Sequence, residues 1–130
     1  MKQSLLQEKY PVYSLELSQE ETSLKGVDAI IDFLKQKVEA HPAAKLIAVF
    51  DHYGHTYSLP NGEIAPDIVD AKNLVFCFGM KLPNPQVLAV RPRSIGVTET
   101  KAGYVINFLE APMPEANRMM EEWVKSVVAA

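Results

Sequence analysis

The sequence predicts an α+β fold, a two-layer sandwich in which two main helices pack on one face of a mostly antiparallel sheet. Three observations support this prediction. Several segments alternate apolar and polar side chains, which is typical of strands with one face in water. Two other stretches repeat apolar residues at the spacing of a helix. Two of the alternating segments also flank a short turn, as the strands of a hairpin do.

The chain is expected to begin with a strand followed by a helix. Residues 10–17 alternate apolar and polar side chains, and Ser18 with Glu21 forms a capping box that predicts a helical turn. A longer helix should end at His41, because a residue that precedes a proline disfavours the helical region. The inward stripe of that helix consists of Val27, Ile30, Ile31, Leu34 and Val38.

The middle of the chain contains two segments that are apolar on both faces, residues 45–51 and 73–79, which suit central strands. The longest irregular stretch lies between them, at residues 53–66, and long irregular stretches are frequently functional. A short helix is expected at residues 66–70. Residues 86–90 fit either a helix or a strand.

The last part of the chain predicts a hairpin and a second main helix. Residues 95–100 and 104–109 alternate on either side of a glycine-containing turn. Pro114 suits the first turn of the helix, where its missing N–H leaves no bond unmade. The inward stripe of that helix consists of Ala116, Met119, Met120, Trp123, Val124 and Val127.

Composition limits the class of protein. The 130 residues suit one domain, 1–130, and the hydrophobic content of 48% is ordinary for a globular chain. The formal net charge is −3 and no basic block stands out, which argues against nucleic acid as a partner. Cys77 is the single cysteine, so no internal disulfide forms. No apolar stretch resembles a signal peptide or approaches the roughly 20 residues that cross a bilayer, so we expect a soluble cytoplasmic protein and no membrane partner.

The candidate site is the segment Asp51-His52-Tyr53-Gly54-His55, which follows an apolar strand. Histidines three residues apart are compatible with a metal such as Zn²⁺, and Asp51 or Asp67 would supply a carboxylate. On a strand His52 and His55 would point to opposite faces, so only a turn at Gly54 would bring them together. The alternative is that these side chains cap a helix or bond to the backbone.

Acid–base chemistry is a second interpretation of the same segment. A histidine that an aspartate orients is half of a hydrolytic triad, which makes Asp51 and His52 a candidate pair. A nucleophile is harder to find. Cys77 lies within an apolar strand, where cysteines are usually inert, and Ser58 and Ser94 lack the glycine-framed turn of hydrolases.

Arg91 and Arg93 flank a proline and would point the same way in an extended chain. Guanidinium groups bind carboxylates and phosphates through two parallel hydrogen bonds, so an anionic ligand near the irregular stretch is one interpretation. Ordinary surface charges or ion pairs are the other. The glycines are isolated and form no phosphate-binding loop that would support the anion, and the cofactor stays unknown.

Two short motifs resemble a known family. Val49-Phe50-Asp51-His52 and Phe78-Gly79, in this order of elements, are similar to the bacterial family called domain of unknown function 302. Met80-Lys81 stands where that family continues with Asn-Pro, which suggests a separate, related family. The resemblance implies a two-layer α+β fold and a small, soluble, dimeric bacterial protein.

These observations together predict a dimeric binding domain for a small anionic or metal-linked ligand. The site would include Asp51, His52, His55, Arg91 and Arg93, with His52 and His55 as candidate metal ligands. The alternatives are an enzyme that uses Asp51 and His52 for acid–base chemistry, and a protein-interaction module. Two helices leave one face of the sheet uncovered, and such a face often pairs with a second copy of the chain.

Overall fold

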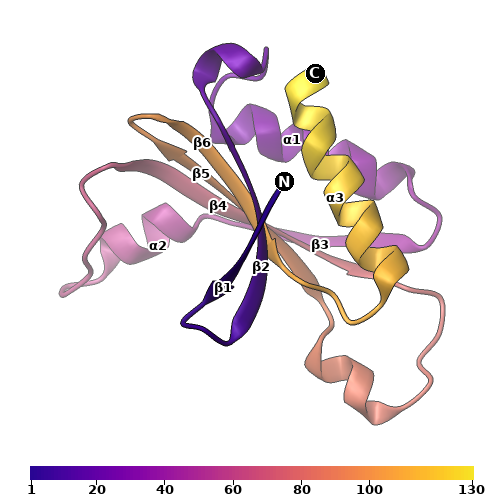
Figure 1. Cartoon of the computed structure of the whole chain (residues 1–130). Coiled ribbons are helices and arrows are strands. Elements are labelled where there is room, and N and C mark those ends of the chain that lie inside the picture. The colour runs from indigo at the N-terminus through magenta and orange to yellow at the C-terminus, as the bar shows by residue number, and fades with distance from the viewer.

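The computed structural model describes residues 1–130 and contains one six-stranded sheet, in the order β1-β2-β6-β5-β4-β3 (Figure 1). All neighbouring strands are antiparallel. The predicted α+β class is therefore confirmed. The strands are β1 (Lys2–Leu6), β2 (Tyr10–Leu17), β3 (Ala44–Phe50), β4 (Ile68–Phe78), β5 (Arg93–Thr100) and β6 (Gly103–Leu109). The helices are α1 (Val27–Ala40), α2 (His52–Ser58) and α3 (Pro114–Ala129), with 3-10 helices η1 (Gln19–Glu21) and η2 (Pro85–Ala89).

The two main helices, α1 and α3, bury their apolar stripes against one face of the sheet, which we call the inner face. Leu34 and Val38 of α1 are fully buried, and Met120 and Trp123 of α3 are nearly so. The Trp123 ring meets the ring of Phe76 from β4 edge-on, with 5.5 Å between the ring centroids. Helical spacing in the sequence thus identified the part of the core that the two helices contribute.

The opposite face of the sheet, the outer face, presents small polar residues. Asn73 of β4, Gly96 of β5, Asn107 of β6 and Ser14 of β2 lie directly opposite one another in register. Residues in direct cross-strand register point to the same face, so these four form one row across the sheet. The row matters for function because neither main helix covers it.

Three local predictions were wrong. The stretch after β3 begins with the helix α2 rather than a loop, since Asp51 caps its first turn. Residues 68–70 pair with the end of β5 instead of forming a helix, and a bulge accommodates the irregular register. Residues 45–51 were expected to form a central strand, but β3 lies at the edge of the sheet and most of its residues are exposed. In addition, the strand β1 was not expected at all. All five of its residues are exposed, so its sequence lacks the apolar alternation of a half-buried strand.

Residues 86–90, which fitted either a helix or a strand, fall mainly in the 3-10 helix η2. The Asn84 side chain caps it by accepting a hydrogen bond from the backbone N–H of Val87. None of the helices has the length and apolar character needed to cross a membrane.

Candidate functional site

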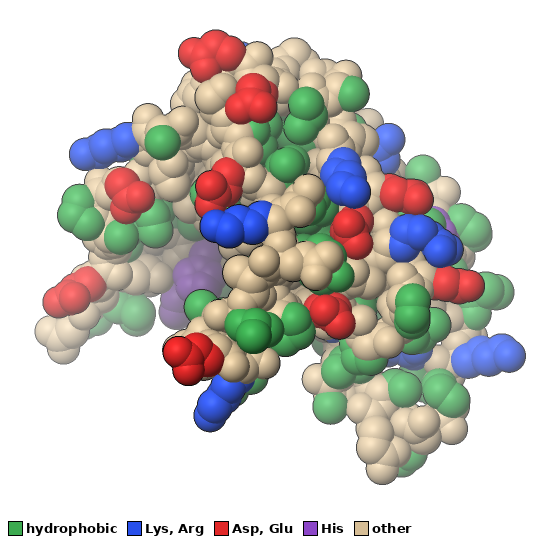
Figure 2. Space-filling model, in the orientation of Figure 1, with side chains coloured by type: hydrophobic (Ala, Val, Ile, Leu, Met, Phe, Trp, Pro, Cys, Tyr) green, Lys and Arg blue, Asp and Glu red, His purple; other side chains and the backbone are tan.

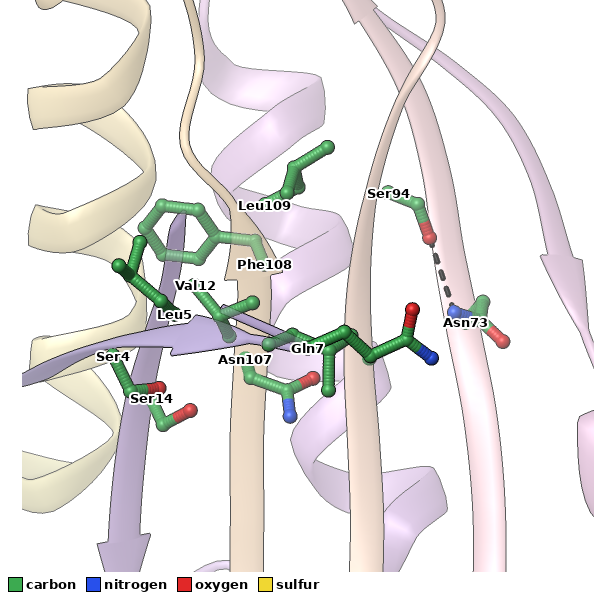
Figure 3. A pocket seen from close by; sticks show the side chains of 12 residues that line it. Ser4, Leu5, Gln7, Val12, Ser14, Asn73, Ser94, Asn107, Phe108 and Leu109 are labelled. Atoms are coloured by element: carbon green, nitrogen blue, oxygen red, sulfur yellow. Dashed lines mark hydrogen bonds between the residues drawn. The ribbon is translucent and has the colours of Figure 1, made fainter. Parts of the chain in front are cut away.

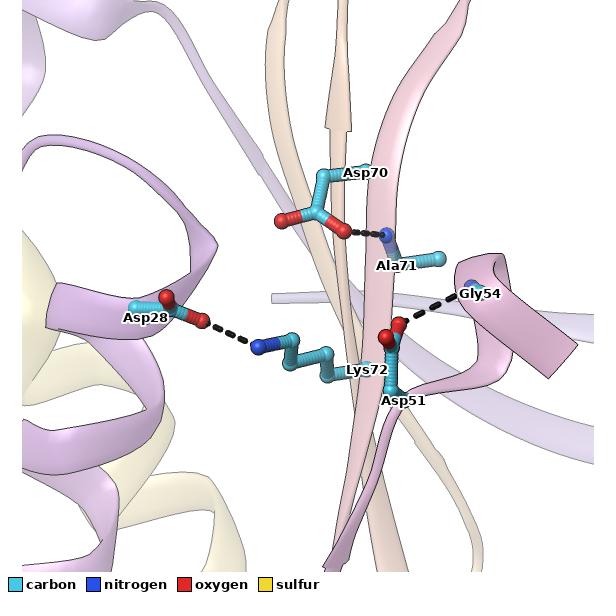
Figure 4. Close-up of polar contacts among 6 residues, drawn as sticks. All are labelled: Asp28, Asp51, Gly54, Asp70, Ala71 and Lys72. Carbon is cyan, nitrogen blue, oxygen red and sulfur yellow. Dashed lines mark hydrogen bonds and ion pairs between the residues drawn. The ribbon is translucent and has the colours of Figure 1, made fainter.

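Asp51 acts as the cap of α2 in the structure. Its Oδ1 accepts a hydrogen bond from the backbone N–H of Gly54 at 3.0 Å (Figure 4). A Cβ atom at position 54 would collide with the Asp51 carboxylate, so the glycine makes this close approach possible. The carboxylate is thereby committed to the helix terminus, where an acceptor is needed for the free N–H groups.

His52 and His55 lie one turn apart on α2, so the helix brings them to one side. Both rings contact the Phe50 ring, with centroid separations of 5.2 Å and 5.5 Å. No group of three or more His, Cys, Asp or Glu side chains that could hold a metal ion occurs in the structure. The two histidines by themselves would supply only two of the four ligands of a structural zinc site.

His52 takes its hydrogen-bond partner from β4 rather than from Asp51. Its Nδ1 lies 3.0 Å from Oδ1 of Asn73. An amide oxygen only accepts, so Nδ1 carries the hydrogen in this assignment, and Nε2 of the neutral ring keeps its lone pair. The Asn73 amide nitrogen in turn donates to Oγ of Ser94 at 3.1 Å (Figure 3).

Asn107 completes the polar row beside this hydrogen-bonded series. A Cβ atom at Gly96 would lie 2.9 Å from Asn107 Oδ1 and 3.8 Å from Asn73 Nδ2. Because Gly96 lacks that atom, the two carboxamides approach the same strand from either side. The sheet thus presents amide and hydroxyl groups from three neighbouring strands.

Two cavities open over this row. One, of about 320 Å³, lies beneath α2 and is lined by His52, Tyr53 and Thr56 together with sheet residues. The other, of about 610 Å³, lies between β1 and the outer-face residues of β2, β4, β5 and β6, and Gln7 extends over it (Figure 3). Both are lined by Asn73, Gly96 and Asn107, so they share a floor. We call the two cavities together the outer trough.

No lysine or arginine head group points into the outer trough. Lys72 contributes to the lining from β4, but its side chain points to the inner face of the sheet, where Nζ lies 2.5 Å from Asp28 Oδ1 on α1 (Figure 4). The hydrogen bond to Asp28 raises the pKa of Lys72. Glu63 is the one carboxylate in the lining. Most other polar groups in the lining are uncharged hydroxyls and carboxamides.

The structure places Arg91 and Arg93 away from this trough. The cavity under α2 reaches Ile68 and Ala71 at the start of β4, whereas Arg91 lies beside Gly79, just after the end of β4. Figure 1 accordingly shows α2 and the loop that contains η2 at opposite ends of the sheet. Neither arginine lines the outer trough, nor does His55.

Arg91 and Arg93 both bind backbone carbonyl groups. Arg91 Nη1 donates to the carbonyl oxygen of Lys81 at 2.7 Å. Arg93 is buried and donates to the carbonyl oxygens of Val90 and Leu109. Burial lowers the pKa of Arg93. The five predicted site residues are thus divided between two regions of the molecule.

Sequence reasoning missed Asn73, Asn107 and Gln7, and it considered Ser94 only as a nucleophile. A signal was present for Asn73, which is a carboxamide at the start of the otherwise apolar segment 73–79. Asn107 likewise interrupts the β-rich run of β6. A polar residue in such a run marks a face that is not packed in the core.

These features define a class of protein, an α+β domain with a polar trough on the open face of its sheet. A family model described as a family of unknown function, DUF6858, matches residues 1–129, and the chain belongs to this family. A relation to domain of unknown function 302 stays a prediction. Neither a search of curated proteins nor a search of solved structures found a match.

Proposed function

We propose that the chain is a binding domain that holds a small, uncharged, hydrogen-bonding molecule in the outer trough. The observation that supports this most directly is the shared floor, where Asn73, Gly96 and Asn107 contribute to both cavities. Carboxamides offer donors and acceptors at once, which suits hydroxyl and amide groups of a ligand. The volume of each cavity is in the range of small-molecule sites.

The charge of the trough disfavours the anion expected from the sequence. The Lys72 side chain points away from the trough to Asp28, and neither Arg91 nor Arg93 reaches it. Glu63 is the one carboxylate in the lining. A metal-linked ligand is the second candidate, because His52 keeps the lone pair on Nε2 while Nδ1 is bonded to Asn73. Such a ligand would bring most of the metal's donor atoms itself, since His52 is the one histidine that lines the trough and no group of three metal-binding side chains is present.

The alternative of an enzyme with acid–base chemistry would need a different partner for His52. The side chain that orients His52 is Asn73, so an acid–base mechanism would use His52 with an amide partner while Asp51 caps the helix. Neutral Asn73 would not stabilise a charged imidazole as a carboxylate does. For this reason we place binding ahead of catalysis.

The test is a solution NMR titration of the purified protein with neutral monosaccharides, nucleosides and N-acetyl amino-acid amides. We expect the side-chain amide signals of Asn73 and Asn107 to shift with at least one of these classes. The variant Asn107→Leu should lose that response, whereas Asn61→Leu, in an exposed loop, should keep it.

Repeating the titration with ZnCl2 and a chelator separates the metal-linked candidate. A response that needs Zn²⁺ and disappears in His52→Gln would favour it. If no probe shifts Asn73 or Asn107, or if Asn107→Leu responds like the wild type, the proposed function is wrong.

A further inference from the structure

All three arginines of the chain gather at the end of the sheet that lies away from α2. Arg91 and Arg118 line a cavity of about 460 Å³, and Arg91 and Arg93 line a smaller one of about 80 Å³. Phe78, Arg91 and Met113 line both cavities, so the two adjoin. We call them together the arginine pocket.

The cations of this pocket lack counter-ions within the protein. The ion pairs of the structure are Lys72 with Asp28 and Lys125 with Glu121, so no arginine takes part in one. Lys81 and His41 also line the larger cavity, and Glu115 is its single carboxylate. The local charge is therefore positive in a protein whose net charge is −3.

Arg93 provides a second, independent sign of a missing partner. Its side chain is only 8% exposed, and its Nε is buried without any hydrogen-bond partner. Buried polar groups in proteins almost always have partners, so the unpaired Nε–H is unusual even though the two Nη atoms bind backbone carbonyls. Arg93 also lines the small cavity.

Two backbone features support an anion at the same place. The helix α3 begins here, and its cap residue Met113 offers no side-chain acceptor to the free N–H groups of the first turn. The positive end of a helix attracts anions. Gly79 has a positive φ of 137°, and a Cβ there would lie 2.9 Å from Arg91 Nη2, so the guanidinium rests against bare backbone.

The rest of the lining is apolar and rich in methionine. Phe78, Met80, Met113 and Met119 line the larger cavity, and Met80 is 86% exposed. Figure 2 shows further hydrophobic side chains on the protruding loop that contains η2, where Leu82 and Leu88 are exposed. Methionine adapts its shape to irregular apolar ligands.

We propose that the arginine pocket binds a small organic anion. Its carboxylate or phosphate head would contact the arginines and the start of α3, and its short apolar tail would lie along Phe78 and the methionines. This site is separate from the outer trough, so a test of the arginine pocket is independent of the test of the proposed function.

The test uses calorimetric titrations with octanoate and octyl phosphate, which share a tail and differ in head group. Acetate and inorganic phosphate serve as probes without a tail. We expect one octyl compound to bind, and its affinity to fall about tenfold in Arg91→Gln, because charge-assisted hydrogen bonds are lost. Arg118→Gln should weaken binding as well. The control Lys101→Gln removes an exposed charge at the β5–β6 turn and should leave binding unchanged.

The probes without a tail and the variants also give results that would contradict the proposal. Failure of both octyl compounds to bind, or equal affinity in Arg91→Gln and Lys101→Gln, would overturn the proposal. Equal affinity for acetate and octanoate would overturn the assignment of the tail to the methionines. Gly79→Ala provides a further check, since it displaces Arg91 without removing its charge and should also weaken binding.

Discussion

Asn73, and not Asp51, is the side chain that orients His52, while Asp51 caps the helix α2. The carboxylate of Asp51 accepts the N–H of Gly54 and starts α2, while the carboxamide of Asn73 accepts the Nδ1 hydrogen of His52. An aspartate next to a histidine in sequence therefore need not orient it. A helix begins at His52, which makes the preceding residue a natural cap.

Substitutions at Asp51 separate the capping role from the acid–base role. We expect Asp51→Ala to destabilise α2 by about 0.5–2 kcal/mol, the usual range for a lost cap. Asp51→Asn should cost much less, because asparagine also caps helices well. Urea unfolding checks both values. If an activity is found and Asp51→Asn abolishes it without changing stability, the capping account is incomplete.

At the scale of elements, α3 packs on the sheet through its apolar stripe. Trp123 is only 6% exposed, and its ring meets the Phe76 ring of β4 and, at 6.1 Å between centroids, the His41 ring that follows α1. Val128, five residues further along α3, is 44% exposed. One helix thus offers a buried and an exposed apolar side chain for comparison.

Truncation of these two residues should have very different effects. We expect Trp123→Ala to lower the free energy of unfolding by about 3–5 kcal/mol, because it leaves a cavity against Phe76. Val128→Ala should change it by about 0.5 kcal/mol or less. Denaturant unfolding of the two variants provides the measurement. Similar values for both would contradict the packing of α3 described above.

At the scale of the whole molecule, one ion pair joins the helical layer to the sheet. The ion pair of Lys72 on β4 with Asp28 on α1 joins the sheet to a helix. Its hydrogen bond raises the pKa of Lys72 above the ordinary value of 10.5. The Asp28 side chain is 75% exposed, so solvent screens the pair and its contribution is small.

The raised pKa predicts the pH range in which this contribution is lost. The folded state holds the Lys72 proton more tightly than the unfolded state, so the stabilisation is complete below pH 10.5 and disappears as pH rises through the folded pKa. We expect Lys72→Met to lower stability by less than about 1 kcal/mol at neutral pH. Thermal melts at increasing alkaline pH should show the wild type and this variant converging. A gap that widens with pH would contradict the assignment.

The homodimer stays a prediction, and the structure suggests where to test it. The edge strand β3 exposes Ile47, Val49 and Phe50, and an exposed apolar edge offers free backbone groups to another strand. We expect light scattering to report a dimer and Ile47→Glu to convert it to a monomer. A wild-type monomer would reject the prediction. A dimer that survives Ile47→Glu would place the contact elsewhere, including the outer face.

The amino-acid sequence by itself determined the α+β class, the two main helices and their buried stripes, and the hairpin. These features follow from local periodicity, which a single stretch of chain contains in full. The sequence did not predict the short helix α2 or the exposed strand β1. A helix of seven residues and an edge strand without buried side chains both show little apolar periodicity.

Only the tertiary structure decided which polar residues meet. Asn73, Gly96 and Asn107 come from three strands, and they share a floor because the register of β4, β5 and β6 sets them opposite one another. A shift of one residue would turn any of these side chains to the other face. The tertiary structure also places Arg91 and Arg93 near the end of β4, away from His52. There they line cavities together with residues around Gly79 and the start of α3.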